Sequence, residues 1–139
     1  MRRPALVAAL ALLCGTASAD EAWRTQHGGV IVYEADHGGT AVLGAEREAG
    51  GPVCVYVSGL GGVWGADRRQ SYDDAYYVAE GEGGPCEAAL QAVDGRTSHD
   101  WGRARVVLTE RGYPTTILLL LTPCGGADEA LIVGEPITP

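Results

Sequence analysis

Short apolar runs rich in β-branched and aromatic residues recur along the chain and are separated by glycine-rich turns. Residues 53–57 alternate strictly, with the valines on one face and Cys54 and Tyr56 on the other, as in a strand. Similar runs predict further strands at residues 30–33, 40–43, 72–78, 105–109, 115–122 and 131–133. Because no long stretch has a helical period, the pattern predicts an all-β fold, a small antiparallel β-sandwich or barrel-like domain.

Two turn signals predict which of these strands pair. Asp36 to Gly39 is turn chemistry between two strand-like runs, and it predicts a hairpin. Asp94-Gly95 predicts a second hairpin, in which residues 90–93 pair with a strand near residues 98–101. Residues 117–121 read ILLLL and leave no polar position, so they predict a strand buried on both faces.

The start of the chain has the pattern of a secretory signal peptide. Arg2 and Arg3 precede an apolar stretch at residues 5–13, and Ala17-Ser18-Ala19 supplies the small residues of a cleavage site. The apolar stretch has about half the length that a membrane-spanning helix needs. We therefore expect residues 1–19 to be a cleaved signal peptide and residues 20–139 to form a single small β domain. The expected location is periplasmic or secreted.

Charge narrows the classes of partner. Removal of the signal peptide leaves 8 arginines against 18 acidic residues, a formal charge of −10. An acidic surface disfavours nucleic acid and anionic lipid, because both attract cationic faces. The sequence has no lysine, asparagine or phenylalanine, which indicates a GC-rich bacterial genome. No later stretch is long enough to span a membrane, so we expect no membrane span in the mature form.

Three cysteines follow the predicted cleavage site, and an oxidising compartment predicts one disulfide among them. We favour Cys86–Cys124, because both cysteines sit beside proline and glycine at the ends of predicted strands. Cys54 lies in the middle of a strand, where we expect a free thiol that packs as a small hydrophobe. No C-x-x-C pair is present, which argues against redox catalysis.

Known catalytic, cofactor and metal signatures are missing. The glycine-rich loop at residues 59–65 carries Trp64 where a dinucleotide-binding fingerprint needs glycine. The three histidines show none of the usual metal-ligand spacings. His99-Asp100 invites a triad with a serine such as Ser98, but no nucleophile-elbow motif is present. We therefore expect no enzyme activity, no catalytic residue, no metal and no cofactor.

The strongest candidate for a binding surface is the tyrosine-rich strand at residues 72–77. Regular alternation would place Tyr72, Asp74 and Tyr76 on one face and Tyr77 on the other. Tyrosines beside a carboxylate can stack on a sugar or anchor a protein, and Trp64 lies in the preceding loop. We expect the face with Asp74 to point outward and Tyr77 to point inward. The alternative is an ordinary strand with one core face and one solvated face.

Together these features suggest a secreted or periplasmic non-catalytic binding or interaction module. Its ligand is unknown, and a protein or glycan of the cell envelope is the class of partner that these residues would suit. Two alternatives are a structural component of the cell envelope and a small secreted hydrolase.

Overall fold

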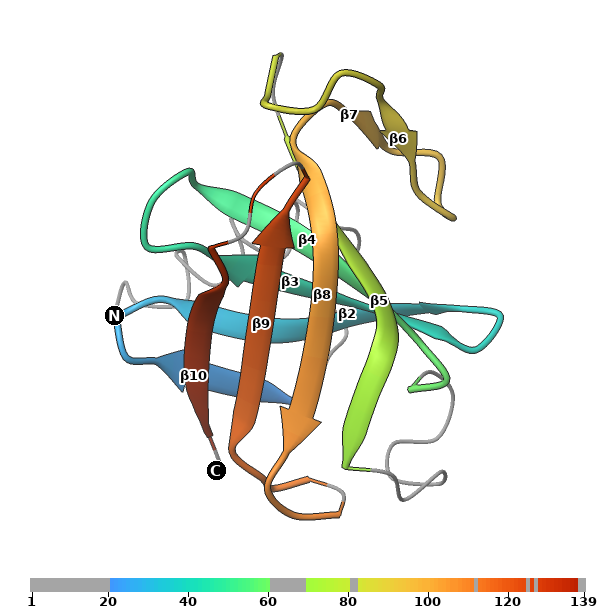
Figure 1. Ribbon diagram of the computed structural model, residues 1–139. Helices are drawn as coiled ribbons and strands as arrows, with labels where there is room; N and C mark the ends of the chain where they lie inside the picture. The colour runs from blue at the N-terminus through green and yellow to red at the C-terminus, as the bar shows by residue number, and fades with distance from the viewer. Residues whose placement is uncertain are drawn as a thin grey trace, which may run out of the picture.

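Eight antiparallel strands close into a barrel (Figure 1). The computed structural model describes residues 21–60, 70–80, 83–111, 113–124, 126 and 128–137. These residues contain strands and turns but no helix, so no helix among them could cross a membrane. The predicted all-β class is confirmed, and of the two predicted architectures the chain adopts the barrel. The predicted signal peptide and Trp64 lie outside the described residues.

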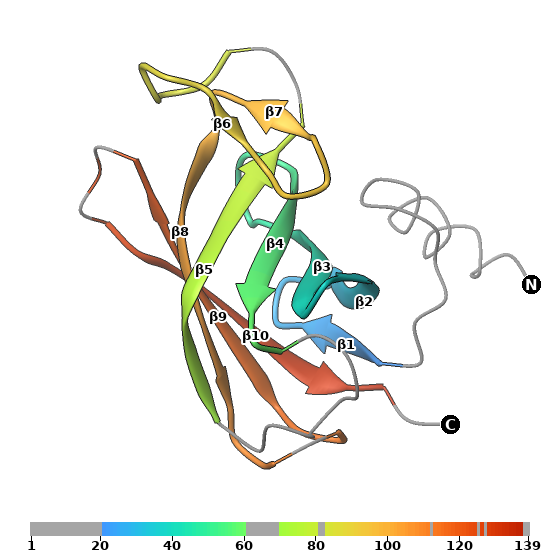
Figure 2. The same cartoon turned by 90° about the vertical axis from the view of Figure 1, so that its right-hand side faces the viewer.

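The barrel is a simple meander with one insertion. Its strands are β1 (Ala22–Thr25), β2 (Val30–His37), β3 (Thr40–Glu46), β4 (Pro52–Ser58), β5 (Ser71–Ala79), β8 (Trp101–Leu108), β9 (Ile117–Pro123) and β10 (Ala130–Pro136). Each strand pairs with the next one listed, and β10 pairs with β1 to close the ring. A small hairpin, β6 (Leu90–Gln91) and β7 (Thr97–Ser98), is inserted between β5 and β8. We call residues 86–98 the flap, which projects from one end of the barrel (Figures 1 and 2).

Both predicted hairpins are present. In the β2–β3 turn, the backbone N–H of Gly39 donates to Asp36 Oδ1 over 2.9 Å, and Gly39 itself has a φ of 96°. In the flap, Leu90 pairs with Ser98, and Gly95 adopts a φ of 93° in the turn. Glycine and aspartate therefore form both turns, as the sequence predicts.

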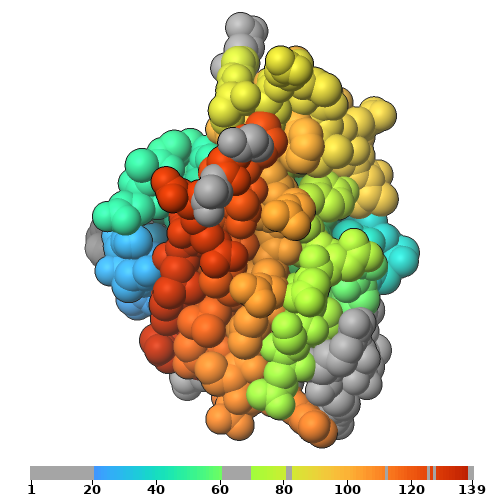
Figure 3. All heavy atoms as spheres, viewed as in Figure 1, coloured from blue at the N-terminus to red at the C-terminus, as the bar shows by residue number. Residues whose placement is uncertain are grey.

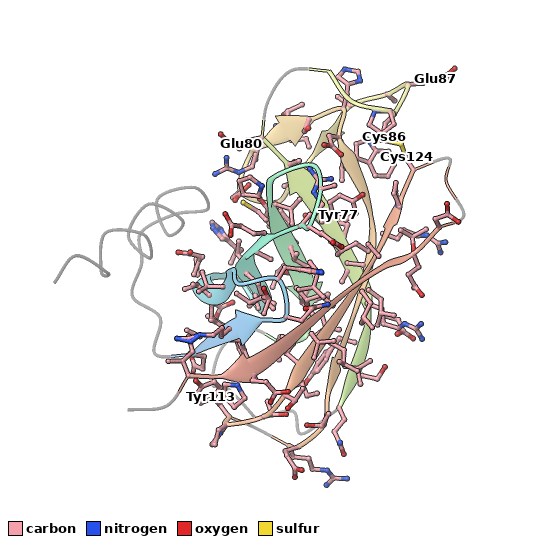
Figure 4. The ribbon with its side chains drawn as sticks, turned by 90° about the vertical axis from the view of Figure 1, so that its left-hand side faces the viewer. Tyr77, Glu80, Cys86, Glu87, Tyr113 and Cys124 are labelled. Carbon is pink, nitrogen blue, oxygen red and sulfur yellow. A yellow bond between two sulfur atoms is a disulfide. The ribbon has the colours of Figure 1, made fainter. Side chains whose placement is uncertain are left out.

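Inward side chains fill the barrel. They come from every barrel strand and include Trp23, Ile31, Leu43, Val55, Tyr72, Tyr77, Val106, Leu119 and Ile132, all of them buried. At one end, the Trp23 ring meets Tyr113 edge-on with centroids 5.4 Å apart. At the other end, Arg47 lies 5.8 Å above the centre of the Tyr77 ring and forms an ion pair with Asp100. Figure 4 shows Tyr77 inside the barrel and Tyr113 at its far end. The interior is thus a packed core.

The outer side of β9 differs from the prediction. Residues Ile117, Leu119 and Leu121 are buried in the core, but Leu118 and Leu120 are only half-buried on the outer face. The prediction that this strand is buried on both faces is therefore wrong. An unbroken apolar run can mark a strand that two layers cover, but a barrel wall has one core side only.

The cysteines give one confirmed and one wrong prediction. Cys86 and Cys124 form the predicted disulfide, with Cα atoms 5.7 Å apart, and it joins the base of the flap to the end of β9 (Figure 4). Cys54 is also disulfide-bonded, and no described cysteine is free, so the expected free thiol is wrong. Cys54 belongs to a cluster on the outer side of the barrel wall. Its side chain is fully buried there with Tyr56, on the face that the alternation of residues 53–57 predicts.

Candidate functional site

The residues predicted to form a binding surface are not brought together on one open face. Tyr72 is only 2 % exposed and lies in the barrel core, so its predicted outward orientation is wrong. Asp74 is exposed and Tyr76 is half-buried on the outer side, whereas Tyr77 lies inside, as predicted. Trp64, the fourth predicted residue, lies outside the part of the chain that the structure describes.

A β-bulge explains the misplaced tyrosine. Tyr72 pairs with Val106 and Ala75 pairs with Ala104, so three steps along β5 match two steps along β8. The extra residue shifts the alternation, and Tyr72 joins Ala75 and Tyr77 on the inner face. One sequence signal could have indicated the bulge. Two consecutive aspartates in a regular strand would point one carboxylate into the core, which is costly, whereas the bulge leaves both exposed.

Tyr76 instead supports the flap. Its ring stacks on Tyr56 of β4, with centroids 4.9 Å apart and planes 13° from parallel. The Tyr76 hydroxyl accepts a hydrogen bond of 3.1 Å from the backbone N–H of Val93. The Tyr56 hydroxyl donates to Asp94 Oδ2 over 2.9 Å. Burial of Tyr56, together with this neighbouring carboxylate, raises the pKa of its hydroxyl, so the hydroxyl stays protonated and remains a donor.

Further contacts fix the flap along its length. The indole N–H of Trp101 donates to the Ala88 carbonyl over 2.8 Å, and Ala92 packs against the outer wall of the barrel. Arg96 forms an ion pair with Glu80, at the end of β5. Figure 4 shows Glu80 and Cys86 at the base of the flap, where the disulfide holds it to β9. The flap is thus a rigid attachment to the barrel.

The tip of the flap, residues 92–96, presents an apolar side chain to solvent. The Ala92 N–H donates to the Arg96 carbonyl over 2.7 Å, and the Gly95 N–H donates to the Ala92 carbonyl over 2.9 Å. Val93 is 54 % exposed, and its backbone N–H is already satisfied by Tyr76. The tip therefore holds the apolar side chain of Val93 in a fixed, exposed position, where a partner could contact it.

Two shallow grooves at the end of the barrel near Arg47 are weaker candidates. They have volumes of about 440 and 240 Å³ and share His27, Arg47 and Glu48 in their walls. Their charges are largely paired within the chain. Arg47 binds Asp100 and the Gly51 carbonyl, and His27 Nε2 lies 3.2 Å from Glu48 Oε1. The grooves therefore offer a ligand little unpaired charge.

The residues that suggested catalysis have structural partners. His99 Nδ1 lies 3.1 Å from the Cys86 carbonyl oxygen, and Ser98 Oγ accepts a 2.9 Å bond from the Asp100 N–H. Within the described residues, no group of three or more histidine, cysteine or acidic side chains could hold a metal ion. Comparisons of the chain with protein-family models, curated proteins and solved structures find no match.

Proposed function

We propose that this chain is a non-catalytic binding module that acts outside the cytoplasm and engages a protein partner through the tip of the flap. The observation that carries the proposal is a rigid insertion whose tip presents Val93, the most exposed large apolar side chain among the described residues. Strands β5 and β8 are neighbours in the barrel, and a short turn could join them, yet the chain inserts the flap there. Functional residues commonly lie on such loops held by a rigid scaffold.

Preorganisation gives the flap a physical advantage in binding. A flexible loop loses conformational freedom when a partner orders it, whereas Tyr56 and Tyr76 already hold this tip in place. Val93 can then enter an apolar pocket and leave water at little entropic cost. The acidic charge of the chain favours approach to a partner with a basic surface.

A protein suits this site better than a glycan. Sugar rings stack on exposed aromatic faces. Of the tyrosines on β5, Tyr72 and Tyr77 are buried, and Tyr76 is stacked on Tyr56 beneath the flap. An apolar tip such as Val93 matches a hydrophobic pocket on a protein.

The proposed location rests on the pattern of residues 1–19 and on the Cys86–Cys124 disulfide, which suits an oxidising compartment. The intact mass of the secreted protein tests it. We expect a chain that begins at Asp20, and mature material that retains residues 1–19 would contradict the proposal.

Affinity capture with matched flap variants tests the binding function. The processed protein is immobilised and exposed to envelope extract and culture medium, and captured proteins are quantified by mass spectrometry. We expect a partner that the wild type and Gln91→Glu capture and that Val93→Asp loses. The control adds the same negative charge at an exposed position of the same flap. An identical captured set for Val93→Asp and the wild type would contradict the proposal and would favour a structural envelope component.

A further inference from the structure

The outer face of β8, β9 and β10 carries an apolar patch. These strands lie side by side on one open face, and Figure 3 shows no other described strand over them. Leu131 is 47 % exposed there, and four neighbours are half-buried. We call these five side chains the outer patch: Val107, Leu118, Leu120, Leu131 and Val133.

The strand register makes the outer patch continuous. Leu118 lies directly between Val107 on β8 and Val133 on β10. One step along the same face, Leu120 lies opposite Leu131. Side chains paired in this way across antiparallel strands are about 5 Å apart and touch each other. The patch therefore forms one surface that spans three strands.

Charged residues of opposite sign border the two sides of the outer patch. Arg103 and Arg105 lie on β8, whereas Glu129 and Glu135 lie on the β10 side. Arg105 Nη2 is 3.8 Å from Glu129 Oε2, and Arg103 forms no ion pair with any residue that the structure describes. The positive and negative charges around the outer patch are therefore equal in number, although the chain as a whole has a formal charge of −8.

From this arrangement we infer that the outer patch is the interface of a homodimer, in which two copies pack face to face about a two-fold axis along β9. A two-fold interface sets the same surface against itself, so it needs complementary halves. Rotation about β9 places β8 of one copy over β10 of the other, so Arg103 of one copy meets Glu129 of the other and Arg105 meets Leu131 in the next row.

The register also matches the two copies row by row. Val107 meets Val133 of the second copy, and Leu118 and Leu120 meet their own counterparts on the axis. Arg103 pairs with Thr122 of β9. Ala130 pairs with Leu121, so the preceding residue, Glu129, lies opposite the same Thr122 on the other side of β9. The two charges therefore lie at the same level along the strands. In the dimer, Arg103 therefore faces a carboxylate that it lacks in one copy. Other faces of two acidic chains would repel each other.

Sedimentation velocity and light scattering over a concentration series test this inference on the processed protein. We expect the mass of a dimer at protein concentrations of about 100 µM and the mass of a monomer after dilution. Leu118→Asp should raise the dissociation constant by about tenfold or more, because Leu118 meets its own counterpart on the axis and the two new carboxylates would face each other. Val93→Asp is the control, since it places the same charge on the flap, outside the outer patch. A monomer at all concentrations, or a dimer unchanged by Leu118→Asp, would overturn the inference.

A charge exchange checks the predicted pairing even if Leu118→Asp fails to fold. Arg103→Glu should weaken the dimer, and Glu129→Arg in the same chain should restore it. Failure of the double variant to recover would contradict the two-fold arrangement. The outcome is separate from the proposed function, because Val93→Asp should lose the captured partner and keep the dimer. If the patch instead binds lipid vesicles or another protein as a monomer, the inference is wrong.

Discussion

Two inward-facing glycines make room for the largest side chains of the barrel core. A Cβ atom on Gly134 would stand 2.8 Å from Trp23 Cβ and 2.9 Å from Ile117 Cγ2. A Cβ atom on Gly102 would stand 2.7 Å from Tyr77 Cε2 and 2.2 Å from the Thr122 carbonyl oxygen. Interiors are close-packed, so each of these side chains occupies space that its glycine leaves empty.

Gly102→Ala should therefore destabilise the fold by about 2–3 kcal/mol, because the added methyl meets a backbone oxygen that cannot move aside easily. Urea unfolding measures the change. Gly126→Ala is the control, since a Cβ atom there has nothing closer than 3.5 Å. Equal losses of stability for the two variants would contradict this explanation of Gly102.

Glu34 is a buried carboxylate in the β2 bulge between Tyr33 and Ala35. Only 2 % of its surface is exposed, and neither oxygen has a hydrogen-bond partner among the described residues. Burial raises the pKa of Glu34 to about 7, because the charged form loses its hydration. The folded state thus prefers the neutral acid, and stability is lost as the pH rises from about 4.5 through 7.

Glu34→Gln should be more stable than the wild type at about pH 8, by about 2–3 kcal/mol at most, because the buried amide does not ionise. The difference should shrink as the pH falls through 7 and vanish below about 4.5. Urea unfolding at several pH values measures it, with Glu87→Gln at an exposed position as the control for the chemical change. Parallel pH profiles for Glu34→Gln and the wild type would show that Glu34 ionises freely in the folded protein.

At the scale of elements, the flap depends on two tyrosine hydroxyls that are separate from its hairpin. Tyr76→Phe keeps the ring that stacks on Tyr56 and removes only the acceptor for the Val93 N–H. We expect about tenfold faster hydrogen exchange at the Val93 amide and a loss of global stability of about 1 kcal/mol or less.

Tyr113→Phe is the matched control, because its hydroxyl bonds the Ala22 and Ile137 carbonyls at the far end of the barrel. It should leave exchange at Val93 unchanged. Unchanged exchange in Tyr76→Phe would show that the tip is held by its own turn alone.

Local signals predicted most elements, and long-range pairing decided the rest. The flap hairpin followed from Asp94-Gly95, and the disulfide followed from the turns around Cys86 and Cys124. The bulge that turned Tyr72 inward depends on how β5 registers with β8, which are separated by the flap in sequence. The role of Tyr76 as a flap support depends in the same way on Val93, 17 residues later. The hairpin that carries the candidate site was thus predictable from the sequence, but the exposure of Val93 and its support by Tyr76 were not.

For the whole molecule, closure of the barrel depends on its shortest strand. β1 forms three residue pairs with β10 and three with β2, whereas β3 and β4 form seven. The sequence AWRT gave no strand signal, because four residues show too little alternation to separate a strand from a polar entry segment. What holds β1 is Trp23, which is fully buried and donates from Nε1 to the Thr115 carbonyl over 2.8 Å.

Trp23→Ala should therefore cost about 3–5 kcal/mol and open the barrel at this strand. Loss of β1 would expose the edges of β2 and β10, and unpaired edges associate with other chains. We expect a lower urea midpoint together with light scattering that grows with concentration. Arg24→Ala changes an exposed side chain on the same strand and should shift stability by less than about 0.5 kcal/mol. If Trp23→Ala unfolds without aggregation, and amides of β2 and β10 stay protected from exchange until global unfolding, β1 is not the element that closes the barrel.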